Sequence, residues 1–222
     1  MSLVFVVMSW RDTWAIDWPT DVDIRVVNVW PSDLCRSVKN TIKSFSGVSC
    51  GCRDGNCLTM GCSSFAANIE CGRRCVNLGC RNNRMECRRW GAVQVFDTGC
   101  YGVGLRARQD FFCGDFVLEY VGVVYPATEL PDLLEDRRYV LDLGYGVFID
   151  ASKIGGVARY INHCCELNCG FFRWIVGGLP RVGVFALKNI VTGSELTVNY
   201  GMTGLGGKAG FICKCEKCNL EV

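Results

Sequence analysis

The sequence has little net charge and no long apolar run. Its 24 Lys and Arg residues against 22 Asp and Glu residues leave a formal charge of +2, with a single histidine, His163. This balance excludes a polyelectrolyte whose bulk charge by itself indicates a nucleic-acid or membrane partner. No apolar stretch approaches the roughly 20 residues that span a bilayer. The opening MSLVFVVMSW has no Lys or Arg before its short apolar run, so the pattern of a signal peptide is missing. We therefore expect a soluble, intracellular protein.

The composition is that of a folded chain with an excess of cysteine. Half of the 222 residues are apolar and 11% are aromatic, and burial of that much surface offsets the ordering entropy that keeps other chains disordered. The 17 cysteines stand in a chain too long to depend on disulfides for its stability. Where thiols stay reduced, clustered cysteines more often bind metal. The sequence therefore predicts a metal-binding protein.

The cysteines divide the chain into parts. Eight of the 17 lie between Cys50 and Cys87. Residues 1–48 hold four of the six tryptophans without a usable periodicity, and we expect a poorly defined lead-in there. Residues 49–90 have few large aliphatic side chains, so this segment needs metal for its cohesion. We expect one domain over residues 91–201 and a short Cys-bearing segment over residues 202–222.

The part that follows Val93 has the pattern of a mostly β domain. Short runs of β-branched and aromatic residues alternate there with Gly, Asp and Asn, and we expect strands in VQVF, FVLEYVGVVY, YVLDL, VFID, RVGVFAL and ELTVNY. Only the stretch around residues 127–138 looks helical. The predicted fold class is mostly β, with several small sheets and few short helices.

The first cysteine array predicts a structural zinc site. Thiolates at such short spacings suit tetrahedral zinc, and sulfur at every position leaves no opening for a metal-bound water. Two zinc ions need eight donor positions, so either one thiolate bridges both ions or Cys87 completes the set. We favour a bridge by Cys57 or Cys71. The seven ligands are Cys50, Cys52, Cys57, Cys62, Cys71, Cys75 and Cys80.

A second array near the C-terminus supplies three further ligands. These are Cys213, Cys215 and Cys218, and no fourth ligand lies near them in sequence. The candidates for the fourth position are Cys164, Cys165 and Cys169. A zinc ion capped by one of them fastens the C-terminal segment over the stretch that contains His163.

Two stretches resemble the signature motifs of the SET-domain protein lysine methyltransferases. The first is RYINHCCELNC, residues 159–169, and the second is GSELTVNYG, residues 193–201. Residues 102–105 and 114–122 resemble the opening strands of that family. The first cysteine array is similar to the family's "associated with SET" (AWS) zinc segment, and the second to its post-SET zinc segment. The resemblance covers roughly residues 48–218 and implies the SET fold.

Two positions are similar to the nuclear-receptor-binding SET-domain group. They are Cys164 after the histidine and Asn199 before the last tyrosine. The known substrate of that group is lysine 36 of histone H3, which implies the H3 tail and the nucleosome as partners and the nucleus and chromatin as the location. The resemblance also implies about three structural zinc ions. Two of them share Cys57, and Cys165 joins Cys213, Cys215 and Cys218 on the third.

The implied reaction moves a methyl group from S-adenosylmethionine to a lysine amine, which must be neutral to attack. A free lysine has a pKa of about 10.4, and an apolar site that holds a cation disfavours the charged form by up to roughly 3 to 5 units. A narrow channel with Tyr120, Tyr139 and Tyr200 as candidate walls would desolvate the amine.

By the same resemblance, Tyr200 is the catalytic tyrosine, and Tyr139 is a second catalytic candidate. We expect Arg159 mainly to hold the turn at Asn162. The residues expected to bind the cofactor are Gly102, Val103, Gly104, Tyr139, Arg159, Asn162, His163 and Tyr200.

Four positions depart from the family pattern. Val103 stands for Trp, Val123 for Glu and Leu167 for Pro, and Val198 stands for a Phe or Tyr that in many members helps set how many methyl groups are added. These changes motivate an alternative function, a catalytically weak or inactive SET-like module that docks on nucleosomes. A zinc-based ubiquitin-ligase adaptor predicts cross-braced His and Cys pairs, which the spacing does not show.

Six arginines lie between Cys71 and Trp90 against a single acid, Glu86. On a rigid zinc segment they can contact nucleosomal phosphates without reading sequence, and the alternative is a solvated surface with no such role. These residues are Arg73, Arg74, Arg81, Arg84, Arg88 and Arg89.

Overall fold

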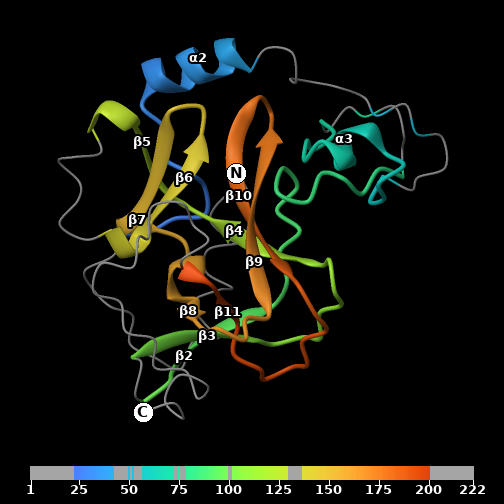
Figure 1. Ribbon diagram of the computed structural model, residues 1–222, viewed down its shortest axis with the longest axis vertical. Coiled ribbons are helices and arrows are strands. Elements are labelled where there is room, and N and C mark those ends of the chain that lie inside the picture. The colour runs from blue at the N-terminus through green and yellow to red at the C-terminus, as the bar shows by residue number, and fades with distance from the viewer. Residues whose placement is uncertain are drawn as a thin grey trace, which may run out of the picture.

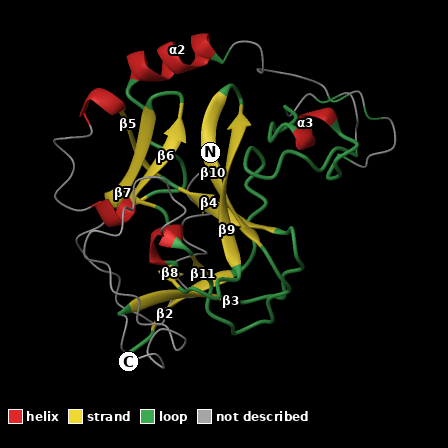
Figure 2. Cartoon of the chain, in the orientation of Figure 1, coloured by secondary structure: helices red, strands yellow, loops and turns green. Residues whose placement is uncertain are grey.

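The computed structural model describes residues 23–42, 50, 52, 57–72, 75, 79–99, 102–129 and 137–200. These residues form several small β-sheets and few short helices, so the predicted mostly β fold class is confirmed (Figures 1 and 2). Within this part of the chain, every helix is too short or too polar to cross a membrane.

The largest sheet is built around the long strand β7, Val147–Gly155. β5 (Gly122–Pro126) and β6 (Val140–Gly144) pair with it in antiparallel fashion, and β1 (Asp23–Ile24) pairs with it in parallel. Alternate residues of β7 are buried, as expected for a strand with one face on the core.

The second sheet has the order β4–β10–β9. β4 (Phe116–Tyr120) is buried along its whole length, and β10 (Leu179–Ala186) pairs with β9 (Cys169–Val176) as a hairpin. The two residues between β9 and β10 are Gly177 and Gly178, with φ angles of 59° and 78°. Glycine adopts these left-handed angles without strain, and they match the twist of a two-residue hairpin.

Two further pairs complete the sheets. β2 (Val93–Asp97) and β3 (Val103–Ala107) form an antiparallel hairpin. The two-residue strands β8 (Asn162–His163) and β11 (Thr197–Val198) run parallel, and β8 follows the 3₁₀ turn η4 (Val157–Tyr160). The β8–β11 pair lies between the β2–β3 hairpin and the other sheets (Figure 1). Parallel pairing places residues far apart in the sequence on neighbouring strands.

A single core joins the sheets. Leu105 of β3, Ile149 of β7 and Val184 of β10 have no exposed surface and belong to one apolar cluster, together with Leu196 beside β11. Each such side chain contributes about 1.5 to 3 kcal/mol on burial. The short β8–β11 pair therefore rests on a packed core rather than on its own few hydrogen bonds.

Part of the expected lead-in packs on this domain. The helix α2, Ser32–Thr41, buries Val38, and Ile42 at its end is also buried in the core. Leu34, Val38 and Ile42 recur every four residues, which is the spacing of one helix face. Residues 1–22 lie outside the described part of the chain.

The cysteine-rich segment packs against the second sheet. Its short helix is α3, Ser63–Ala66 (Figure 1). Ile69 forms a bridge with Ile175 of β9, and the Phe65 ring lies 5.4 Å from that of Trp174. A second apolar cluster fills this contact, with Met85, Phe116, Trp174, Val176 and Phe185 as its buried members.

Some element boundaries differ from the sequence predictions. The expected helix over 127–138 is described only at its ends, as one 3₁₀ turn at residues 127–129 and another, η3, at Arg137–Tyr139. Of the expected strand ELTVNY, only Thr197–Val198 is a strand. The sequence reasoning did not single out β9, whose frequent aromatic residues favour a strand.

Candidate active site and metal centre

The two signature motifs meet at the β8–β11 pair. Thr197 is the register partner of Asn162, and Val198 is the partner of His163. Two residues after β11, the main-chain N–H of Tyr200 donates to Nδ1 of His163 over 3.1 Å, and the two rings lie 5.5 Å apart. The structure therefore brings Tyr200 next to the asparagine–histidine pair.

The hydroxyl of Tyr200 is buried and held by the main chain. It donates to the carbonyl of Ile161 over 2.9 Å. Burial, with a smaller contribution from Tyr139, raises the pKa of Tyr200 to about 12 from an ordinary value of 10.0. Burial also lowers the pKa of His163. Both side chains are therefore neutral at pH 7, which suits hydrogen bonding more than proton transfer.

The Asn162 amide is fixed by an acidic residue of the second motif. Its Nδ2 donates to Oε1 of Glu195 over 2.9 Å and to the carbonyl of Val103 over 3.4 Å. With both amide hydrogens engaged, Oδ1 is the atom of this group that remains as an acceptor. Glu195 was not among the expected site residues, although it stands inside the second motif.

The start of β3 comes close to this group. A Cβ at Gly104 would lie 2.6 Å from Thr98 Cγ2 and 2.9 Å from Oε1 of Glu195, so a larger residue there requires these side chains to shift. Gly102 has a φ of +72°, and a Cβ at that position would meet no described atom within 4 Å. The main chain that follows Gly102 reaches Asn162 through the Val103 carbonyl.

Tyrosine side chains form the second half of the site. The guanidinium of Arg159 lies 4.3 Å from the ring centre of Tyr139 and donates to the carbonyls of Ala151 (2.8 Å) and Ser152 (3.1 Å). Tyr120 donates its hydroxyl to the Tyr139 carbonyl over 2.8 Å, and burial raises its pKa well above the usual range. Arg159 therefore holds Tyr139 through its ring, while its own position is fixed by β7.

The departures from the family pattern fall at ordinary structural positions. Val198 is buried in the core, and Val123 is half-buried on β5 opposite Asp150. Val103 packs against the main core as a partly buried residue. None of the three valines disturbs the contacts that join Asn162, His163 and Tyr200.

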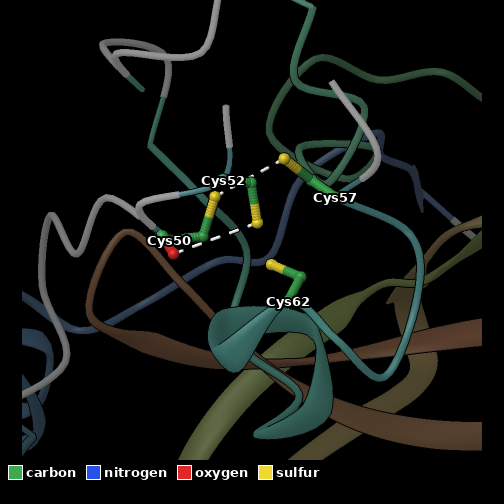
Figure 3. A group of neighbouring side chains, drawn as sticks. All are labelled: Cys50, Cys52, Cys57 and Cys62. Atoms are coloured by element: carbon green, nitrogen blue, oxygen red, sulfur yellow. Dashed lines mark hydrogen bonds between the residues drawn. The ribbon is translucent and has the colours of Figure 1, made fainter. Parts of the chain in front are cut away.

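Four thiols of the first array form one group (Figure 3). The sulfur atoms of Cys50, Cys52, Cys57 and Cys62 all lie within 4.8 Å of one another. Tetrahedral zinc with bonds of about 2.3 Å needs sulfurs roughly 3.8 Å apart, so this set fits a zinc ion. The structure confirms that the array can hold a metal.

A second group shares one thiol with the first. It consists of Cys50, Cys71 and Cys75. The Cys50 and Cys57 sulfurs lie 3.4 Å apart, and the Cys57 thiol also interacts with Cys80. The thiol common to both groups is therefore Cys50, whereas the sequence favoured Cys57 or Cys71 as the bridge. Cys87 is exposed and belongs to neither group, which favours a bridging thiolate over completion by Cys87.

The thiols lie so close together that a cation between them would stabilise their deprotonated form. Burial raises the pKa of Cys57, Cys71 and Cys80 to about 12. Burial also acts to raise the pKa of Cys50, but hydrogen bonds from Cys52, Cys57 and Cys71 outweigh it and lower this pKa to about 6. A divalent ion at the centre lets the neighbouring thiols lose their protons together.

The second array lies mostly outside the described residues. Cys213, Cys215 and Cys218 are not among them. Of the three candidates for the fourth ligand, Cys169 is fully buried in the main core, whereas Cys165 is exposed with its sulfur 3.6 Å from Nε2 of His163. This placement favours Cys165 over Cys169 as a ligand.

The expected basic face needs a correction at Arg84. Arg81, Arg88 and Arg89 are exposed, but Arg84 is only 8% exposed. Its guanidinium lies 4.8 Å from the Phe185 ring centre and 5.2 Å from that of Trp174. Arg84 therefore contacts aromatic rings rather than solvent, and it is not available to phosphate. Arg73 and Arg74 lie outside the described residues.

A comparison with known families identifies the fold. Residues 102–201 match the family model of the SET domain. These residues form a SET domain. The matched range begins at Gly102, before β3, and ends directly after Tyr200, so it contains both motifs of the site.

Curated relatives of the SET domain and its flanking segments carry one printed name, "Histone-lysine N-methyltransferase, H3 lysine-36 specific". The protein from Mycosarcoma maydis is 37% identical over 72% of this chain and 17% of its own length. The protein from Yarrowia lipolytica is 34% identical over 78% of this chain and 23% of its own length. The protein from Homo sapiens is 34% identical over 87% of this chain and 7% of its own length. The chain thus spans less than a quarter of each of these relatives.

A solved structure shares the fold. It is a chain of "Crystal structure of an active polycomb repressive complex 2 in the stimulated state", with a TM-score of 0.61 and 26% identity over 68% of this chain and 23% of that one. A fold similar to that of this chain therefore also occurs in a protein with a different printed title.

Proposed function

We propose that this chain transfers a methyl group from S-adenosylmethionine to a lysine of histone H3, namely lysine 36, on nucleosomes. The observation that carries the proposal is the parallel β8–β11 pair, which sets Tyr200 against His163 beside Asn162. The shared name of the curated relatives supports the choice of lysine 36.

The Asn162 amide and the main chain at residues 102–104 are suited to bind the methyl donor. S-adenosylmethionine would supply a methyl group on its sulfonium, and transfer to a neutral lysine amine would leave a thioether and a methylammonium whose proton passes to water. Neither Gly102 nor Gly104 adds a side chain to this part of the main chain, and the Asn162 amide presents Oδ1 as an acceptor. We assign cofactor binding to these residues together with His163 and the main chain of Val103.

The tyrosines and Arg159 provide the acceptor side. The rings of Tyr139 and Tyr200 suit the apolar stem of a lysine, and the Tyr200 hydroxyl stays neutral. Arg159 lies against Tyr139 as a fixed positive charge. Burial next to a cation favours the neutral amine that can attack, because both effects disfavour a second positive charge. Proximity then replaces a dedicated base.

The flanking segments support the site as zinc-bound elements. We assign the first cysteine array to an AWS-type segment with two structural zinc ions, and Cys165 with Cys213, Cys215 and Cys218 to a post-SET zinc ion. The exposed Arg81, Arg88 and Arg89 are then suited to contact nucleosomal phosphates. A chromatin enzyme of this kind acts in the nucleus.

Mass spectrometry of reconstituted nucleosomes tests the proposal. Incubation with the chain and S-adenosylmethionine should add methyl groups to H3 at lysine 36, and Tyr200→Phe and His163→Ala should lower the yield at least roughly tenfold. Tyr145→Phe, which makes the same change at an exposed tyrosine, serves as a matched control and should stay within about twofold.

The outcomes separate the two candidate functions. Cofactor binding by calorimetry with no methylated histone would remove the histone claim. Loss of both cofactor binding and methylation would favour the alternative, a SET-like module that docks on nucleosomes without turnover.

A further inference from the structure

Asn82 lies fully buried against the metal centre, between two of its cysteines. Its side-chain Nδ2 donates to the carbonyl of Ile69 over 2.8 Å and lies 3.5 Å from the Cys71 sulfur. Its main-chain N–H donates to the Cys80 thiol, and its carbonyl accepts from the main-chain N–H of Cys71 over 2.7 Å. Asn82 has no exposed surface.

We propose that Asn82 is a positioning residue of the metal centre, which holds Cys71 and Cys80 by hydrogen bonds to their sulfur atoms. Two donors from one residue fix two ligands at once. The assignment does not depend on methyl transfer, because it concerns only the cysteine array.

The physical reason lies in the charge of a sulfur-only site. Four thiolates around one divalent ion leave an excess of negative charge, and N–H groups aimed at the sulfurs offset it. Residues that orient metal ligands in this way typically change metal affinity by about 10- to 100-fold when they are replaced. The Asn82 amide occupies a buried position from which water is excluded, so water cannot take over its role.

The same residue joins the metal centre to the SET domain. Ile69, whose carbonyl accepts from Asn82, forms a bridge with Ile175 of β9. The next residue, Glu70, donates its main-chain N–H to the Ile175 carbonyl over 2.9 Å. Displacement of Asn82 would therefore loosen the two cysteine ligands and also the contact between Ile69 and Ile175.

Asn83 provides a matched control. It is the same residue type at the next position, is 8% exposed, and has a side-chain oxygen with no hydrogen-bond partner among the described residues. No described contact joins its side chain to a thiol. Substitution at either position thus removes a buried amide, but only Asn82 donates to metal ligands.

Zinc binding by the full chain tests the proposal. Asn82→Leu removes the side-chain donor at similar volume, and competition with a chromophoric chelator should show about a 10- to 100-fold loss of zinc affinity. Asn83→Leu should stay within about threefold of the wild type. Cobalt substitution reports the same site independently, because the sulfur-to-cobalt charge-transfer band should weaken at equal cobalt concentration only in the Asn82 variant.

A second substitution guards against a variant that does not fold. Asn82→Asp keeps the shape of the side chain and also removes the donor, and far-ultraviolet circular dichroism of the zinc-loaded proteins verifies the fold. Wild-type zinc affinity in a folded Asn82 variant would overturn the proposal. An equal loss in Asn83→Leu would also overturn it, because the effect would then follow from any buried amide.

Discussion

At the scale of single residues, His163 connects the two halves of the site. Its Nδ1 accepts the N–H of Tyr200, so in the neutral ring the proton lies on Nε2, the nitrogen 3.6 Å from the Cys165 sulfur. The position of Tyr200 thus depends on the tautomer of one imidazole. Burial favours the neutral ring because it lowers the pKa of His163.

The Tyr200 hydroxyl should resist ionisation. Its pKa is raised to about 12 by burial, so the neutral form persists through the ordinary value of 10.0. Ultraviolet difference titration of the wild type against Tyr200→Phe should show no tyrosinate from this residue at that pH. One additional equivalent that titrates near the ordinary value in the wild type would mean that the hydroxyl is exposed.

Glu195 should affect the binding of the methyl donor more than the chemical step. Glu195→Ala removes the acceptor of the Asn162 amide, and loss of a hydrogen bond to a charged group costs about 1.5 to 3 kcal/mol, or roughly 10- to 100-fold in affinity. Calorimetric titration with S-adenosylmethionine measures this change. Glu129→Ala, at an exposed acid outside both motifs, is the control, and equal affinities in both variants would contradict the role of Glu195.

At the scale of elements, sequence patterns predicted most of the strands, but they did not predict every contact between residues that are far apart in the chain. The alternation of apolar and polar residues and the presence of turn residues are local signals, so strands could be predicted in residues 93–96 and 116–125. The approach of Glu195 to Asn162 and the burial of Arg84 depend on pairing across the chain. The α2 helix was not predicted, although Leu34, Val38 and Ile42 follow the four-residue spacing of one helix face. The residues around them show no such spacing of apolar side chains.

Arg84 joins the cysteine-rich segment to the second sheet through aromatic rings from α3, β4, β9 and β10. Among the described residues, its Nε and Nη2 have no hydrogen-bond partner. Burial lowers its pKa, which shows that desolvation opposes the charge. Cation–π contacts contribute about 0.5 to 2 kcal/mol of stability. We therefore expect the packing of the Arg84 side chain to matter more for the stability of the fold than its charge does.

Substitutions at Arg84 should therefore separate packing from charge. Arg84→Met keeps the volume and should leave the free energy of unfolding within about 1 kcal/mol, since apolar replacements of buried ions are often neutral. Arg84→Ala opens a cavity and should cost about 2 to 4 kcal/mol. Denaturant titrations of the zinc-loaded proteins give both values. Equal losses in the two variants would show that the charge itself is required.

At the scale of the whole molecule, the cysteine-rich segment packs against the SET domain. Trp174 is buried on β9 and meets Phe65 of the cysteine-rich segment and Phe185 of β10. Loss of metal should loosen this contact as well as the thiol cluster, because the segment has few aliphatic residues of its own.

Removal of zinc should therefore expose Trp174. A chelator should shift the tryptophan emission to longer wavelength and lower the thermal midpoint, and added zinc should restore both. Trp174→Phe is the control, since the shift should shrink in that variant. An unchanged midpoint after verified loss of zinc would contradict the coupling between the segment and the sheet.

The most direct test of the central claim is a competition in one tube. Wild-type nucleosomes and nucleosomes whose histone H3 carries arginine in place of lysine 36 are mixed with the chain and isotopically labelled S-adenosylmethionine, and each H3 is read by mass spectrometry. We predict label on wild-type H3 alone, lost with Tyr200→Phe. Equal label on both histones would contradict the assignment to lysine 36, and full label with Tyr200→Phe would contradict the site built around the β8–β11 pair.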